Sequence, residues 1–288
     1  MEDKENVLVE NEKSDADCEA VASEVAASET AVSGVAAGDD VADGTTASAD
    51  AASTAKASET DSLESDLLSA LEGRAEFYET LAAFYFKPLS LEQIETMAQA
   101  DFSPYAEINE LFSSGFNDIT RYLRKRNTGT RQELAVDFTS SFGGVAVYEG
   151  KSAVPYKSVF TSDDGLMYQE GYQEVFKALK EESVKLRDGL DWPDDHLSFM
   201  CQFMALLSRR IAKAYEEKDY EEALRLIESS QSFLEQHIMS WFPDLHDLAS
   251  KLIKTRFYRG VLKITQGFFE LDTETLKDMA SVVEGCMQ

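Results

Sequence analysis

A helical periodicity runs through nearly all of the chain after Leu63, and this feature most constrains the fold. Apolar residues recur every three or four positions, as they do along one face of an amphipathic α-helix. No alternating pattern of useful length indicates a β-strand, so the sequence predicts an all-α helical bundle. The apolar sets of the C-terminal third are Leu197, Met200, Met204, Leu207, Ile211 and Ala214; Ala223, Leu224, Ile227, Leu234, Ile238 and Trp241; and Leu245, Leu248, Leu252, Val261, Ile264 and Phe268.

The same periodicity predicts helices in the segment before residue 143. An apolar stripe begins at Leu63 and ends before Pro88, which cannot continue a helix. Ser90 and Gln93 have the spacing of a capping box for a short helix through Met97. Further helices are predicted near Tyr105–Phe112, Phe116–Arg126 and Arg131–Phe142.

The first 62 residues differ in composition from the rest of the chain. They contain no aromatic residue, and their 16 Asp and Glu against 3 Lys and Arg give a net charge of 3 − 16 = −13. Such a segment cannot bury enough apolar surface to offset its chain entropy. We therefore expect residues 1–62 to form a disordered acidic tail that is dispensable for folding.

The sequence also predicts where the protein acts and which partners it avoids. Residues 1–6 lack the basic start of an export signal, and no apolar run approaches the ~20 residues of a membrane helix. We expect a cytoplasmic protein without stable membrane insertion. A formal net charge of −27 disfavours nucleic acid and favours a basic partner. The three cysteines, Cys18, Cys201 and Cys286, have no C-x-x-C spacing, so no disulfide framework or metal site is expected.

The longest non-helical segment of the core divides the predicted helices into two groups. Residues 143–164 form this linker loop, between a helical part at 63–142 and another at 165–288. The sequence thus predicts two helical subdomains within residues 63–288. A hinge at Gly189–His196 follows a predicted helix at Glu170–Arg187 and opens the most apolar helix of the chain.

Pro193 and the acidic residues after it are typical of a helix N-terminus. A histidine and a tryptophan, His196 and Trp192, lie at the same start. Because free backbone N–H groups converge at a helix N-terminus, this hinge is predicted to be both a joint and a binding site.

Two other patterns suggest chemistry but lack the context that it needs. Gly144–Ser152 is similar to a phosphate-binding loop, yet five residues separate its glycines where the motif needs four, and no strand precedes it. Asp195 and His196 have the composition of a general-base pair, but no serine or cysteine nucleophile has a recognisable setting. We therefore predict no enzyme activity and no cofactor.

Two short motifs carry a resemblance to a known family. The hinge contains Pro193-Asp194-Asp195-His196, and some forty residues upstream Pro155–Phe160 reads Pro-Tyr-Lys-Ser-Val-Phe. In a wholly helical chain this pair resembles the TorD/DmsD/NarJ family of chaperones for molybdenum enzymes, over roughly residues 74–272. The family pattern has an acidic residue directly before the proline; here Trp192 stands there, and Asp191 or Asp194 is expected to supply the carboxylate.

This resemblance implies both a function and a site. Family members bind the twin-arginine leader and the body of a molybdopterin oxidoreductase precursor, of the dimethyl sulfoxide, trimethylamine N-oxide or nitrate reductase type. They delay its export until the cofactor is inserted, act as monomer or dimer, and catalyse no reaction. The expected leader-binding residues are Tyr156, Ser158 and Val159 of the loop, and Asp191, Trp192, Pro193, Asp194, Asp195, His196, Phe199 and Phe203 of the hinge and the helix that follows.

Physical chemistry supports this interpretation. Guanidinium groups prefer planar carboxylate partners, and three aspartates cluster beside the apolar stripe of Phe199 and Phe203. That stripe is also typical of core packing. At its ordinary pKa, His196 would change charge near neutral pH. The alternative is a generic acidic helical scaffold that binds another basic partner, and the sequence shows no repeats of fixed period that would favour it.

Overall fold

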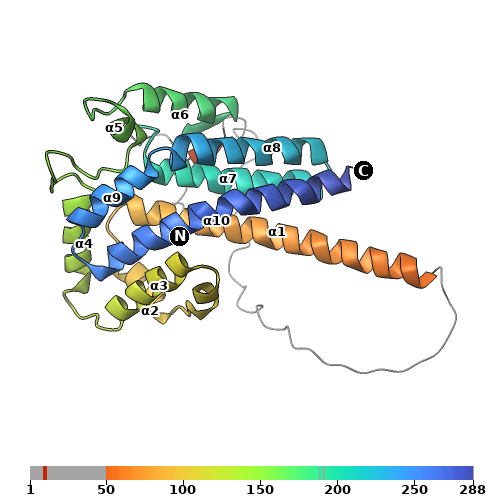
Figure 1. Cartoon of the computed structure of the whole chain (residues 1–288), viewed down its shortest axis with the longest axis horizontal. Helices are drawn as coiled ribbons and strands as arrows, with labels where there is room; N and C mark the ends of the chain where they lie inside the picture. The colour runs from red at the N-terminus through yellow and green to blue at the C-terminus, as the bar shows by residue number, and fades with distance from the viewer. Residues whose placement is uncertain (1–8, 12–49, 188, 191, 288) are drawn as a thin grey trace.

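A computed structural model of the protein describes residues 9–11, 50–187, 189–190 and 192–287. Long helices lie side by side in an elongated bundle, with shorter helices at one end (Figure 1). The all-α prediction is confirmed. No helix in the described ranges combines the length and the apolar character that a membrane span needs.

Helices make up most of the described chain. In chain order the elements are β1 (Val9–Asn11), α1 (Asp50–Phe86), α2 (Leu91–Gln99), η1 (Ser103–Glu107), α3 (Glu110–Leu123), α4 (Thr130–Ser141), α5 (Lys157–Thr161), α6 (Glu170–Glu181), β2 (Val184–Leu186), α7 (Leu197–Glu216), α8 (Tyr220–Phe233), the π-helix η2 (Leu234–Met239), α9 (Phe242–Leu252) and α10 (Arg256–Cys286).

Several boundaries differ from the predicted ones. Helix α1 begins at Asp50 and not near Leu63, because the alanine-rich segment before Leu63 contains good helix formers. The predicted disorder of residues 1–8 and 12–49 lies outside the described residues. The capping box is confirmed: Ser90 Oγ accepts from Gln93 N at 3.1 Å, and Gln93 Oε1 accepts from Ser90 N at 2.9 Å. In place of the two helices predicted near residues 105–112 and 116–126, the structure has the short 3₁₀ helix η1 followed by one continuous helix, α3.

The structure also contains a strand pair that the sequence did not predict. Strand β1 pairs antiparallel with β2, and β2 occupies residues where the α6 helix was expected to continue. Helix α7 begins at Leu197, so Pro193 lies in the turn before the helix and not inside its first turn. Short helix α5 lies within the linker predicted at residues 143–164.

Helices from both predicted halves share one core. Helix α1 packs against α7, and α3 packs against α10. Helices α3 and α10 approach each other closely at Gly115, where a Cβ atom would lie only 2.9 Å from the Gly260 carbonyl oxygen. A buried ion pair, Arg74 Nε to Asp272 Oδ1 at 2.6 Å, joins α1 to α10. The division into subdomains at residues 143–164 stays a prediction.

Candidate functional site

The predicted loop and hinge meet through their backbones. Leu197 N donates to Pro155 O at 2.9 Å, and Lys157 N donates to Asp195 O at 3.1 Å. Tyr156 and His196 form an isolated antiparallel bridge. We call this unit, residues 154–160 with 193–198, the loop–hinge joint. The sequence motifs, some forty residues apart, thus form one structural unit at the N-terminus of α7.

Asp195 fixes this joint from inside. It is fully buried, and its Oδ2 accepts from Ser158 N at 2.7 Å. Its Oδ1 and the hydroxyls of Ser158 and Ser198 are buried without a hydrogen-bond partner among the described residues. Burial raises the pKa of Asp195, and the hydrogen bond from Ser158 N opposes that shift. Asp195 therefore supports the joint and offers no exposed carboxylate to a peptide.

His196 is the N-cap of α7 and not a titrating surface group. Its Nδ1 accepts from Ser198 N at 3.1 Å, which requires a neutral ring. Only 2% of the residue is exposed, and this burial lowers its pKa to about 3. The prediction that His196 changes charge near neutral pH is therefore wrong, because desolvation disfavours the imidazolium.

An exposed aromatic and acidic surface covers the joint. Trp192 is 41% exposed, and its ring centroid lies 5.3 Å from that of His196. Asp194 is half-buried; its carboxylate hydrogen-bonds to the Tyr172 side chain, which opposes the rise in its pKa caused by burial. Tyr168 packs edge-on against Tyr172 at 5.2 Å.

We define the hinge face as Tyr156, Tyr168, Tyr172, Trp192 and Asp194. Tyr156 belongs to it because its ring lies 4.8 Å from that of His196, and burial raises the pKa of its hydroxyl to about 12. Two members, Tyr168 and Tyr172, were not predicted. The available signal was the spacing of four between the aromatic residues at 168, 172 and 176, which leads into α6 beside its buried Val175 and Leu179.

The other predicted residues do not share this surface. Phe199 and Phe203 belong to the core, with 0% and 1% exposure, and Pro193 is buried. Phe203 forms part of the floor of a hollow of about 460 Å³ between α6 and α8. Val159 lines a different hollow of about 560 Å³, toward α9. Asp191 lies outside the described residues.

A buried lysine ties the joint to two further elements. Lys157 is 3% exposed; its Nζ pairs with Glu174 of α6 and lies 2.9 Å from His237 Nδ1 of η2. Burial, followed by the charge of Lys157, lowers the pKa of His237 to about 4. The cluster fixes α5 and α6 against η2, and so positions the aromatic residues of α6 beside the hinge.

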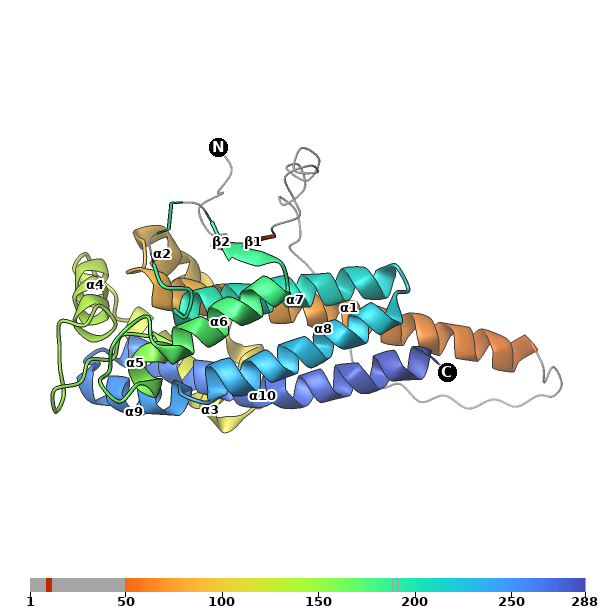
Figure 2. The ribbon, with the colours of Figure 1, turned by 90° about the horizontal axis from the view of Figure 1, so that it is seen from above.

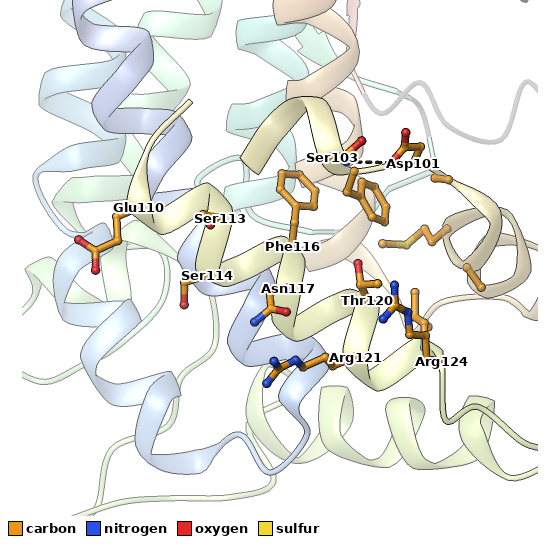
Figure 3. A pocket seen from close by; sticks show the side chains of 15 residues that line it. Asp101, Ser103, Glu110, Ser113, Ser114, Phe116, Asn117, Thr120, Arg121 and Arg124 are labelled. Carbon is orange, nitrogen blue, oxygen red and sulfur yellow. Dashed lines mark hydrogen bonds between the residues drawn. The ribbon is translucent and has the colours of Figure 1, made fainter. Parts of the chain in front are cut away.

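A further hollow of about 780 Å³ lies away from these residues, between α2, η1 and α3 (Figure 3). Arg121 and Arg124 lie at one end of it and Glu110 at the other, and Asp101 accepts a hydrogen bond from Ser103 N at 2.9 Å. None of the predicted site residues lines it. Within the described ranges, no group of three or more His, Cys, Asp and Glu is placed to hold a metal ion.

Comparison with known proteins gives consistent matches. The family model described as "Nitrate reductase delta subunit" matches residues 93–247, a range that includes both motifs of the joint and all of α6. Chaperone protein TorD of Vibrio vulnificus strain YJ016 is 29% identical over 211 residues, 71% of this chain and 95% of that protein. The TorD proteins of Vibrio cholerae strain N16961 and Aliivibrio fischeri strain ES114 are 27% and 24% identical, over 72% and 74% of this chain and 94% and 98% of their own lengths.

Proposed function

Because the chain belongs to the nitrate reductase delta subunit family, the TorD/NarJ family of chaperones, we propose that it binds the twin-arginine leader of a molybdopterin oxidoreductase precursor. Membership of this family supports a general function as a chaperone in molybdoenzyme maturation. The proposal adds that the protein acts in the cytoplasm, without catalysis, and delays export of its client until the cofactor is inserted. The client is a reductase of the dimethyl sulfoxide, trimethylamine N-oxide or nitrate type.

The observation that carries the proposal is the setting of Asp194. Its carboxylate is half-buried, and its hydrogen-bond partner is the neutral Tyr172; no cation pairs with it among the described residues. Tyr172 of α6 lies beside it, and the exposed rings of Tyr168 and Trp192 belong to the same hinge face. A leader guanidinium would give this carboxylate a planar charged partner and would stack on the rings.

The apolar part of a leader also has a matching surface. Leu166 and Met167, which precede Tyr168, are 55% and 45% exposed. Phe176 continues the same side of α6, with its ring centroid 6.1 Å from that of Tyr172. In this proposal the leader's apolar segment packs on these side chains, while Phe199 and Phe203 support the site from the core.

Titration calorimetry with synthetic leaders tests the proposal. Replacing both leader arginines with lysine keeps the charge but removes the planar fork, and should cost about 1–3 kcal/mol of binding free energy. The variant Asp194→Asn should remove most of that difference, because both changes affect the same contact. The control Asp247→Asn alters an aspartate of α9 whose side chain is 80% exposed, and it should leave the difference intact.

A scrambled peptide of equal charge separates this function from the alternative. If no twin-arginine leader binds more tightly than the scrambled peptide, the chaperone proposal fails. The generic acidic scaffold would then be the better description.

A further inference from the structure

The strand pair β1–β2 joins segments far apart in the sequence. Val9 lies opposite Leu186, Glu10 opposite Lys185 and Asn11 opposite Val184. The pair lies at the edge of the bundle, beside α7 (Figure 2). One partner therefore comes from the acidic N-terminal segment, and the other from the connection between α6 and the hinge.

The segment around β2 is built to receive a strand. Val184 is 1% exposed, Lys185 is exposed and Leu186 is half-buried against the core, which is the alternation of a strand with one face packed. The turn before β2 is fixed, because Arg210 Nη1 donates to Glu182 O at 2.8 Å and Ser183 N donates to Lys180 O at 2.9 Å. An edge strand held in this way presents backbone donors and acceptors to a partner.

The charges favour the partner that is present. Residues 1–49 contain 13 Asp and Glu and 2 Lys and Arg, and one of these acids, Glu10, stands opposite Lys185 in the register. Opposite charges directly across an antiparallel pair are favourable. The acidic segment belongs to the same chain as β2. Its effective concentration at β2 is therefore set by the length of the connecting chain and not by the protein concentration.

We infer that the edge of β2 is a strand-docking site whose resident occupant is the chain's own segment Val9–Asn11. Docking pairs the edge of β2 and ties the acidic segment to the connection between α6 and the hinge. A pairing of three residues is weak by itself, so the docked strand exchanges with an open state. This inference is independent of the proposed leader binding.

Hydrogen–deuterium exchange on the full chain, without any client, tests the inference. Glu10→Pro removes a backbone donor within β1, and it should lower the protection of the β2 amides about tenfold. Glu24→Pro makes the same change of charge and residue type outside β1, and should leave that protection unchanged. Unchanged protection in Glu10→Pro, or an equal loss in both variants, would overturn the docking site.

A charge exchange tests the register and the source of the strand. Glu10→Lys and Lys185→Glu should each lower protection of β2, and the double variant should restore it. Failure of the double variant to restore protection would contradict the register. Protection that rises with protein concentration would show that the occupant is the strand of a second copy, and would overturn docking within one chain.

Discussion

At the scale of single residues, Asp194 and Asp195 show how neighbours in the sequence come to different roles. Asp194 is half-buried, with Tyr172 as its partner, whereas Asp195 is fully buried and accepts from the Ser158 backbone. The sequence suggested both as carboxylates for a basic leader. In the proposed function that task falls to Asp194, because a carboxylate enclosed by the joint cannot reach a peptide.

Substitution of Asp195 should separate its charge from its hydrogen bond. Asp195→Ala leaves Ser158 N–H buried without an acceptor, and should lower the free energy of unfolding by about 1–3 kcal/mol at pH 7. Asp195→Asn keeps an acceptor and removes a charge that burial disfavours, so it should be at least as stable as the parent. Urea denaturation measures both; a large loss in the Asn variant would show that the charge itself holds the joint.

His196 should make the protein sensitive to acid. Its pKa is about 3 in the folded state and about 6.5 when unfolded, so the unfolded state binds more protons between these values. Its contribution to stability is present above about pH 6.5 and is lost as pH falls toward 3. The contribution of Asp195 to stability changes with pH in the opposite direction, because its folded pKa is raised.

The variant His196→Asn isolates this contribution, since asparagine also caps helices. Between pH 7 and pH 5 the parent should lose ~2 kcal/mol more unfolding free energy than the variant. If the parent and the variant lose equal unfolding free energy in urea denaturation, the imidazole of His196 must become protonated within the folded joint.

At the scale of elements, the crossing of α3 and α10 depends on two glycines. A Cβ at Gly260 would lie 2.6 Å from the Gly115 carbonyl oxygen, so Gly260→Ala should force the helices apart and cost about 1–3 kcal/mol. Gly285→Ala makes the same change in the same helix with no atom within 4 Å, and should leave stability unchanged or slightly raised. Thermal unfolding compares them; similar melting temperatures would show that the crossing can relax.

Most helices could be predicted because their apolar spacing and caps are local properties of the sequence, as at Ser90. Strand β2 could not, because three residues carry too short a pattern and their partner lies in a distant acidic segment. The meeting of loop and hinge was predicted through their motifs. Which of their side chains are exposed depends on the packing of α6 over the joint. The spacing of residues along the chain does not determine that packing.

At the scale of the whole molecule, the N-terminal segment should contribute little to global stability. A chain that begins at Asp50 loses only the contacts of β1 among those described, so its melting temperature should stay within about 2 °C of the full chain. A chain that begins at residue 72 also loses the buried Leu67 and Leu71, and should melt several degrees lower. A large drop in the first chain would show that residues 1–49 pack on the bundle.

The Arg74–Asp272 pair has a consequence for the order of events during synthesis. Arg74 Nη2 also donates to Asp272 Oδ2 at 3.0 Å, and Tyr78 Oη donates to the same oxygen at 2.6 Å, so an early helix depends on a carboxylate translated 198 residues later. Until the ribosome releases α10, the α1 guanidinium has no counter-ion at its native position. Each newly made copy must therefore complete this part of its core after residue 272 has left the ribosome, and a ribosome stalled before residue 272 would hold an unfinished bundle.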